Sequence, residues 1–114
     1  MYNRITIIGN VGKDPETKTL EGGAKVTTFT LATSETWKDK QGNKKEETQW
    51  HNIQLWRGLA EVAEQYVKKG TKLLIEGKVT YRSYEKDGET KYFTEIVGKE
   101  MKMLGGKPQN DEPF

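Results

Sequence analysis

Two tryptophans in the run TQWHNIQLW, residues 48–56, are flanked by side chains that indicate which way each ring points. Successive side chains of a β-strand face opposite sides, so Trp50 and Trp56 share one face with two amides. The other face carries the aliphatic Ile53 and Leu55. A purely structural indole would normally join the aliphatic face, because burying an aromatic ring is strongly favourable. The pattern therefore favours indoles displayed to solvent, where a flat ring can stack on another flat group.

A second stretch repeats this separation of an aromatic ring from the aliphatic side chains. Alternation over residues 72–84 divides the side chains into an apolar set, Leu73, Ile75, Val79 and Tyr81, and a polar set, Lys72, Glu76, Lys78, Thr80, Arg82 and Tyr84, with Leu74 as an exception. Rings among cations suit an unpaired nucleic-acid strand, because bases stack on the rings and phosphates follow the positive charge. Each stack is worth roughly 1 to 3 kcal/mol whatever the base, so such a surface would bind without reading sequence.

Each of these residues also has a plainer interpretation. Trp50 and Trp56 could be buried under a neighbouring subunit, and Tyr84 lies at the mouth of a hairpin, where exposed rings are common. Trp37 has the parity of the apolar residues before it, so its exposure requires a bend or bulge after Thr33. The loop lysines Lys40, Lys44 and Lys45 are ordinary solubility residues singly, although as a group they could touch phosphate.

The single histidine is the residue that an enzyme would need. His51 alternates with the aliphatic side chains beside Ile53, which favours a core or interface role over catalysis. One histidine cannot supply a nucleophile, a base and an orienting group, and the carboxylates are scattered over loops and a helix. The chain has no cysteine, which excludes disulfides and thiolate metal sites. The glycine spacing in GNVGKD matches neither a Walker loop nor a dinucleotide fingerprint. We expect no enzyme, no metal and no cofactor.

Composition limits the size of the core. With 114 residues, of which 32% are hydrophobic and 32% charged, the chain can form one domain with a thin core. We expect that domain to occupy residues 1–104 and a short flexible tail with an acidic tip to occupy residues 105–114. No apolar run reaches the roughly 18 residues of a membrane span, and the start does not resemble a signal peptide. The expected location is the cytoplasm, near the nucleoid.

The elements that must position the aromatic residues alternate along the chain. Strands are predicted at residues 3–12, 24–33, 48–56, 71–84 and 91–97, and a helix at residues 59–70 that is capped by Gly70. Five strands with one helix between the third and fourth give the order of an all-β OB-fold, a five-stranded antiparallel Greek-key barrel. An SH3-like barrel or a small open α+β sheet would be compatible with the same pattern.

Several stretches together resemble one known family. In chain order they are IGNVGKDPE, FTLATSETW, QWHNIQLW, LAEVAEQYVKKG, LLIEGKVTYRSY, YFTEIV and MLGG. This order is similar to that of bacterial single-stranded DNA-binding proteins, and the resemblance covers residues 2–106. It implies an OB barrel that assembles into a homotetramer and wraps single-stranded DNA during replication, recombination and repair.

The resemblance also implies roles for individual positions. By this resemblance, the residues expected to stack on bases are Trp37, Trp50, Trp56 and Tyr84. The residues expected to contact phosphate are Lys40, Lys69 and Arg82. His51 matches a position near the subunit contact. Members of the family end in acidic residues followed by Pro and Phe, a tip that docks on replication and repair proteins. The matching residues here are Asp111, Glu112, Pro113 and Phe114. One departure is the short GGKPQN segment, which stands where most relatives have a long linker.

Three rival functions remain open from the sequence. OB surfaces also bind RNA and oligosaccharides, so an OB-fold RNA binder is the main alternative. A third possibility, from another class, is a structural interaction module whose aromatic face is covered by a protein. Competition between DNA, RNA and glycan ligands would separate these functions.

Overall fold

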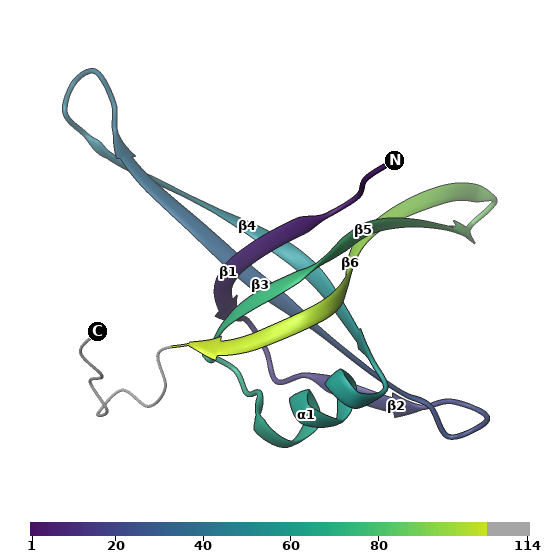
Figure 1. Cartoon of the computed structure of the whole chain (residues 1–114). Helices are drawn as coiled ribbons and strands as arrows, with labels where there is room; N and C mark the ends of the chain where they lie inside the picture. The colour runs from purple at the N-terminus through teal and green to yellow at the C-terminus, as the bar shows by residue number, and fades with distance from the viewer. Residues whose placement is uncertain (105–114) are drawn as a thin grey trace.

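The computed structural model describes residues 1–104, which form one barrel with two projecting hairpins (Figure 1). The elements are β1 (Ile5–Val11), β2 (Glu16–Thr19), β3 (Lys25–Lys38), β4 (Lys44–Trp56), α1 (Gly58–Tyr66), β5 (Lys72–Lys86) and β6 (Glu89–Leu104). The strand order is β1-β5-β6-β4-β3-β2, and an additional β1–β3 pairing closes the barrel. Within the described residues, no helix is long and apolar enough to cross a membrane.

The predicted five-stranded Greek-key barrel is confirmed, with the helix in the predicted place. Two details go beyond the prediction. The strand β2 is an additional short strand on the edge of β3, joined to it by a turn in which Gly22 and Gly23 have φ angles of +91° and +92°. The pairing of β4 with β6 is parallel, whereas the other strand pairs of the described residues are antiparallel.

The core is made by the aliphatic side chains that the alternation selects. Fully buried side chains from three strands meet at the centre of the barrel, among them Leu31, Ile53, Leu55, Leu73 and Ile75. The helix covers one end of the barrel with Ala60 and Ala63, whose small size lets its backbone approach closely. The buried hydroxyl of Thr27 donates a hydrogen bond of 3.0 Å to the carbonyl oxygen of Ala60, which ties α1 to β3.

The helix is shorter than predicted, because tertiary hydrogen bonds take its last backbone donors. It ends at Tyr66, and Val67 is already extended. The N–H of Lys69 donates to Oδ1 of Asp14 at 2.8 Å, and the N–H of Gly70 donates to the carbonyl oxygen of Val11 at 2.8 Å. The segment after the helix is therefore bound to the end of β1 and the following loop, and Gly70 is a turn residue rather than the helix cap.

The hairpins β3–β4 and β5–β6 extend beyond the barrel (Figure 1). In the first, every residue from 40 to 50 is exposed, and in the second every residue from 81 to 92 is exposed. Alternation therefore stops predicting burial in these segments, since both faces of a two-stranded ribbon meet solvent. Tyr81 illustrates the effect: it has the parity of the core residues Leu73 and Ile75, yet its side chain is 73% exposed.

Candidate nucleic-acid interface

The face of β4 that carries the tryptophans is turned away from the core. Trp50 pairs with Ala32 of β3, and Trp56 pairs with Val26. Their side chains are 60% and 38% exposed, whereas Ile53, between them on the opposite face, is 1% exposed. The prediction that the indoles lie apart from the aliphatic core is confirmed. Two exposed rings therefore stand on one strand face, with the half-buried amides of β4 between them.

Backbone and side-chain contacts fix both rings. The indole Nε1 of Trp56 donates a 2.9 Å hydrogen bond to Oε1 of Gln54, on the same strand face. The ring of Trp50 lies against Gly12, in the loop after β1. A Cβ atom at Gly12 would be only 2.5 Å from Cζ3 of Trp50 and 2.9 Å from Oγ1 of Thr30. The absence of a side chain at Gly12 is therefore what lets the indole approach this loop.

Replacing Gly12 by alanine should move the Trp50 ring without unfolding the barrel. The added methyl group meets the far end of a side chain that can swing into solvent, so destabilisation should be small. Affinity for oligo(dT) should fall by at most the roughly 1 to 3 kcal/mol of one base stack. Titrations of Gly12→Ala, Trp50→Ala and the double variant measure the coupling. If Gly12→Ala weakens binding equally when Trp50 is already absent, the glycine does not act through the ring.

Trp37 is exposed for a different reason from the one expected. Its side chain is 47% exposed, but β3 is continuous and pairs with β4 without a register shift from Val26 to Lys38. The bend or bulge after Thr33 that its parity required is therefore absent from the described hairpin. The ring meets solvent because the hairpin has left the barrel at this point. By register, Trp37 lies on the opposite face of the β3–β4 ribbon from Trp50.

Arg82 and Tyr84 lie on one face of the β5–β6 hairpin. The side chain of Tyr84 is 49% exposed. Arg82 is held by Glu95 of β6, with Nε at 2.9 Å from Oε1, and its guanidinium carbon lies 5.5 Å from the centroid of the Phe93 ring. Sequence reasoning missed Phe93 and Glu95. Alternation counted back from the buried Ile96 would have separated both from the core residues, as it did for the tryptophans.

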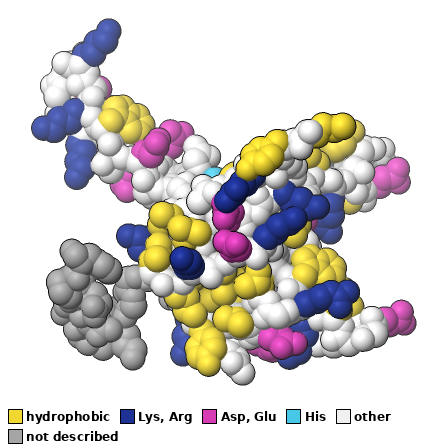
Figure 2. Space-filling view, viewed as in Figure 1, with side chains coloured by type: hydrophobic (Ala, Val, Ile, Leu, Met, Phe, Trp, Pro, Cys, Tyr) yellow, Lys and Arg dark blue, Asp and Glu magenta, His cyan; other side chains and the backbone are white. Residues whose placement is uncertain are grey.

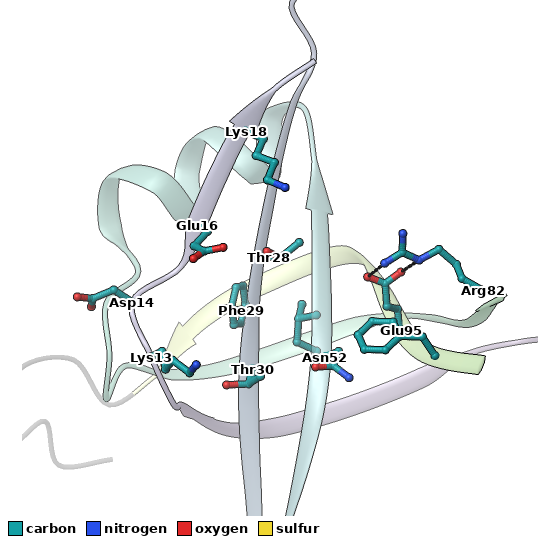
Figure 3. Close-up of a pocket in the computed structure, with 12 residues that line it drawn as sticks. Lys13, Asp14, Glu16, Lys18, Thr28, Phe29, Thr30, Asn52, Arg82 and Glu95 are labelled. Carbon is teal, nitrogen blue, oxygen red and sulfur yellow. Dashed lines mark hydrogen bonds and ion pairs between the residues drawn. The ribbon is translucent and has the colours of Figure 1, made fainter. Parts of the chain in front are cut away.

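A groove of about 360 Å³ lies between the base of the β5–β6 hairpin, at Arg82, Phe93 and Glu95, and the strands β2, β3 and β4 (Figure 3). Its lining residues come from five strands and the loop after β1: Lys13, Asp14, Glu16, Lys18, Thr28, Phe29, Thr30, Asn52, Ile53, Arg82, Phe93 and Glu95. Lys13, Lys18 and Arg82 supply positive charge, while hydroxyl and amide groups of β3 and β4 face the same space. Lys13 and Lys18 were not selected from the sequence, because exposed lysines beside carboxylates resemble ordinary surface charge.

The remaining predicted cations lie apart from this groove. Lys40 is exposed in the turn of the β3–β4 hairpin, where Figure 2 shows dark-blue lysine side chains around the tip at upper left. Lys69 is exposed after the helix, and its backbone lies beside Asp14 of the groove. The predicted tip residues, Asp111, Glu112, Pro113 and Phe114, fall outside the described residues.

His51 is half-buried on the predicted face of β4. Its Nε2 lies 2.9 Å from Oγ1 of Thr33 on the neighbouring strand. Burial lowers the pKa of the imidazole below its ordinary value, because the cation loses hydration. The folded state therefore favours the neutral form of the His51 imidazole.

This lowered pKa predicts how stability changes with pH. When the pKa of a group is lower in the folded chain than in the unfolded chain, the folded chain is most stable at pH values above the unfolded pKa, which is about 6.5 for histidine. That stabilisation is lost as the pH falls through the unfolded value toward the folded one. The melting temperature should therefore decrease between about pH 7 and pH 5. His51→Gln should decrease less over the same range, and equal decreases in both proteins would contradict the assignment.

The closed barrel, its strand order and its helix define a protein of the OB-fold class. Comparison with known proteins narrows the class. The model of the single-strand binding protein family matches residues 2–104, and the chain belongs to this family. A single-stranded DNA-binding protein of Neisseria meningitidis serogroup A is 47% identical over 109 residues, which are 95% of this chain and 63% of that protein. The chain thus spans less than two thirds of this relative's length.

A second relative and two solved structures agree with the family. Single-stranded DNA-binding protein 1 of Xylella fastidiosa is 42% identical over 112 residues, which are 96% of this chain and 82% of that protein. A Plasmodium falciparum SSB in complex with ssDNA has a TM-score of 0.85 and 33% identity, covering 92% of this chain and 96% of that one. A deletion mutant of the Thermus aquaticus protein has a TM-score of 0.79 and 27% identity, with coverages of 93% and 52%.

Proposed function

We propose that the chain binds single-stranded DNA without reading its sequence and without catalysing a reaction. The observation that carries the proposal is the pair of exposed indoles, Trp50 and Trp56, on a strand whose alternate side chains are buried. Bases would stack on these rings and on Trp37 and Tyr84, while Lys40, Lys69 and the groove lysines follow the phosphates. Family membership and the named binding partner of the Plasmodium protein support the same function.

Titration with oligo(dT) tests this proposal directly. Stacking should quench tryptophan emission, because the three indoles of the chain are all at least partly exposed. Affinity should fall as salt rises, with a log-log slope near 0.7 for each phosphate contacted. Emission that does not change at low salt would contradict the proposal. Competition with RNA of equal length separates the alternative of an OB-fold RNA binder.

We further propose that the protein works as a homotetramer in replication, recombination and repair, near the nucleoid. A single OB surface binds only a few nucleotides, and joined surfaces gain avidity. In this proposal His51 lies at the subunit contact, and exposed apolar side chains such as Ile8, 50% exposed, supply further contact area. The residues Asp111, Glu112, Pro113 and Phe114 would recruit other replication and repair proteins. Light scattering with and without oligonucleotide measures the assembly.

A further inference from the structure

Three side chains at the base of the β5–β6 hairpin form a cluster, in which Arg82 binds Glu95 through its edge and lies over the ring of Phe93. The side chain of Glu95 is 6% exposed, whereas that of Arg82 is 62% exposed. Two bonds join them: Nε to Oε1 at 2.9 Å and Nη2 to Oε2 at 3.2 Å. Figure 3 shows the guanidinium edge directed at the carboxylate. The ring of Phe93 lies under the guanidinium carbon at 5.5 Å from its centroid.

The ion pair makes Arg82 a weaker phosphate contact than a lysine without a counterion in the protein. A buried carboxylate is stable as an anion only when it is paired, so Glu95 holds the arginine edge firmly. Two of the guanidinium donors are occupied, and the positive charge has its counterion within the protein. Arg82 still offers a ligand its remaining N–H donors and, as a larger surface, the face of its planar group opposite Phe93. Nucleobases stack on arginine planes as they do on aromatic rings.

Tyr84 provides a second flat group beside this plane. Arg82 and Tyr84 are two residues apart on one strand face, which separates them by roughly 6.6 Å. Stacked bases are spaced by about 3.4 Å, so one base inserted between the two groups could contact both. A pocket lined by Arg82, Ser83, Tyr84 and Phe93 lies at this position.

We propose that Arg82 and Tyr84 form a slot for one nucleobase, in which Arg82 stacks rather than binding phosphate. Glu95 and Phe93 are positioning residues that fix the plane of the guanidinium group. This inference rests on the proposed binding of single-stranded DNA, and it replaces the phosphate role that the family resemblance implies for Arg82.

Salt-dependent titrations with oligo(dT) distinguish stacking from phosphate contact. Arg82→Lys keeps the charge and a partner for Glu95 but removes the plane, so affinity should fall about tenfold or more with the salt slope unchanged. Phe93→Leu should likewise weaken binding without changing the slope. The matched control is Lys18→Gln, which removes a groove lysine that has no ion pair among residues 1–104 and should reduce the slope by about 0.7.

A fourth variant tests the role of Glu95. Glu95→Gln releases the charge of Arg82, so the salt slope should become steeper than in the wild type, which a merely structural effect would not cause. Wild-type affinity for Arg82→Lys, or a salt slope in Glu95→Gln equal to that of the wild type, would overturn the inference. A wild-type protein that fails to bind oligo(dT) would instead contradict the proposed function itself.

Discussion

Replacing both Trp50 and Trp56 by alanine is expected to lower affinity for oligo(dT) between about 30-fold and about 20,000-fold. Each base stack contributes roughly 1 to 3 kcal/mol, and each 1.4 kcal/mol is tenfold in affinity. The rings are six residues apart on one strand, roughly 20 Å, so they should contact different bases and their effects should add. Tryptophan quenching by the remaining Trp37, or anisotropy of a labelled oligonucleotide, measures the loss.

The control for this variant is Tyr66→Ala. Tyr66 lies at the end of α1 and is 60% exposed, as Trp50 is. Removing it should leave affinity within about twofold, since it belongs to no stacking surface proposed here. The double tryptophan variant should retain a melting temperature close to the wild type. A large decrease in melting temperature with unchanged affinity would mean that the indoles are structural.

The largest effect on stability is expected for Gly77→Ala. Gly77 lies where the pairing of β5 with β6 shifts register, opposite Gly98. A Cβ atom at Gly77 would collide with the carbonyl oxygen of Val97. Because the colliding atoms are backbone, no side chain can move aside, and we expect a loss at the upper end for overpacking, about 3 kcal/mol. The melting temperature should then fall by more than about 10 °C.

Gly58→Ala is the matched control for this substitution. Gly58 begins α1, and a Cβ atom there meets no atom within 4 Å. Alanine has a better helix propensity than glycine, so this variant should be neutral or more stable by up to about 1 kcal/mol. Thermal unfolding of both proteins makes the comparison. Equal melting temperatures of Gly77→Ala and Gly58→Ala would show that β5 and β6 can separate at the register shift enough to accept a methyl group.

Alternation of side chains correctly predicted which side chains are buried where a strand lies on the barrel. It separated Trp50 and Trp56 from Ile53 and Leu55, because one face of β4 is pressed against a core. It failed for Trp37, which was expected to need a bulge, since the rule assumes that a strand stays on the barrel. How far a hairpin continues past its core depends on pairing between two distant segments, and the sequence of one strand alone does not contain this information.

Tertiary partners account for the other differences. The helix was predicted to reach Gly70, yet it ends at Tyr66 because backbone donors after it bind Asp14 and Val11. The stack of Arg82 on Phe93 was missed for a similar reason, since it joins two strands whose register is known only from the fold. The roles of the individual site residues stay predictions until the titrations are made.

The strand order affects how the chain folds as it is synthesised. The first strand pairs with β5, with Ile5 opposite Gly77, and β4 reaches its parallel partner only after β6 exists. A ribosome must therefore release nearly the whole domain before the barrel can close. Most of β1, which pairs with β3 only at Asn10 and Val11, stays unpaired until β5 has been synthesised. Barrels dominated by such distant pairings fold in milliseconds to seconds. During that interval the uncovered edges of the early hairpins are the part of the nascent chain most exposed to aggregation or chaperone capture.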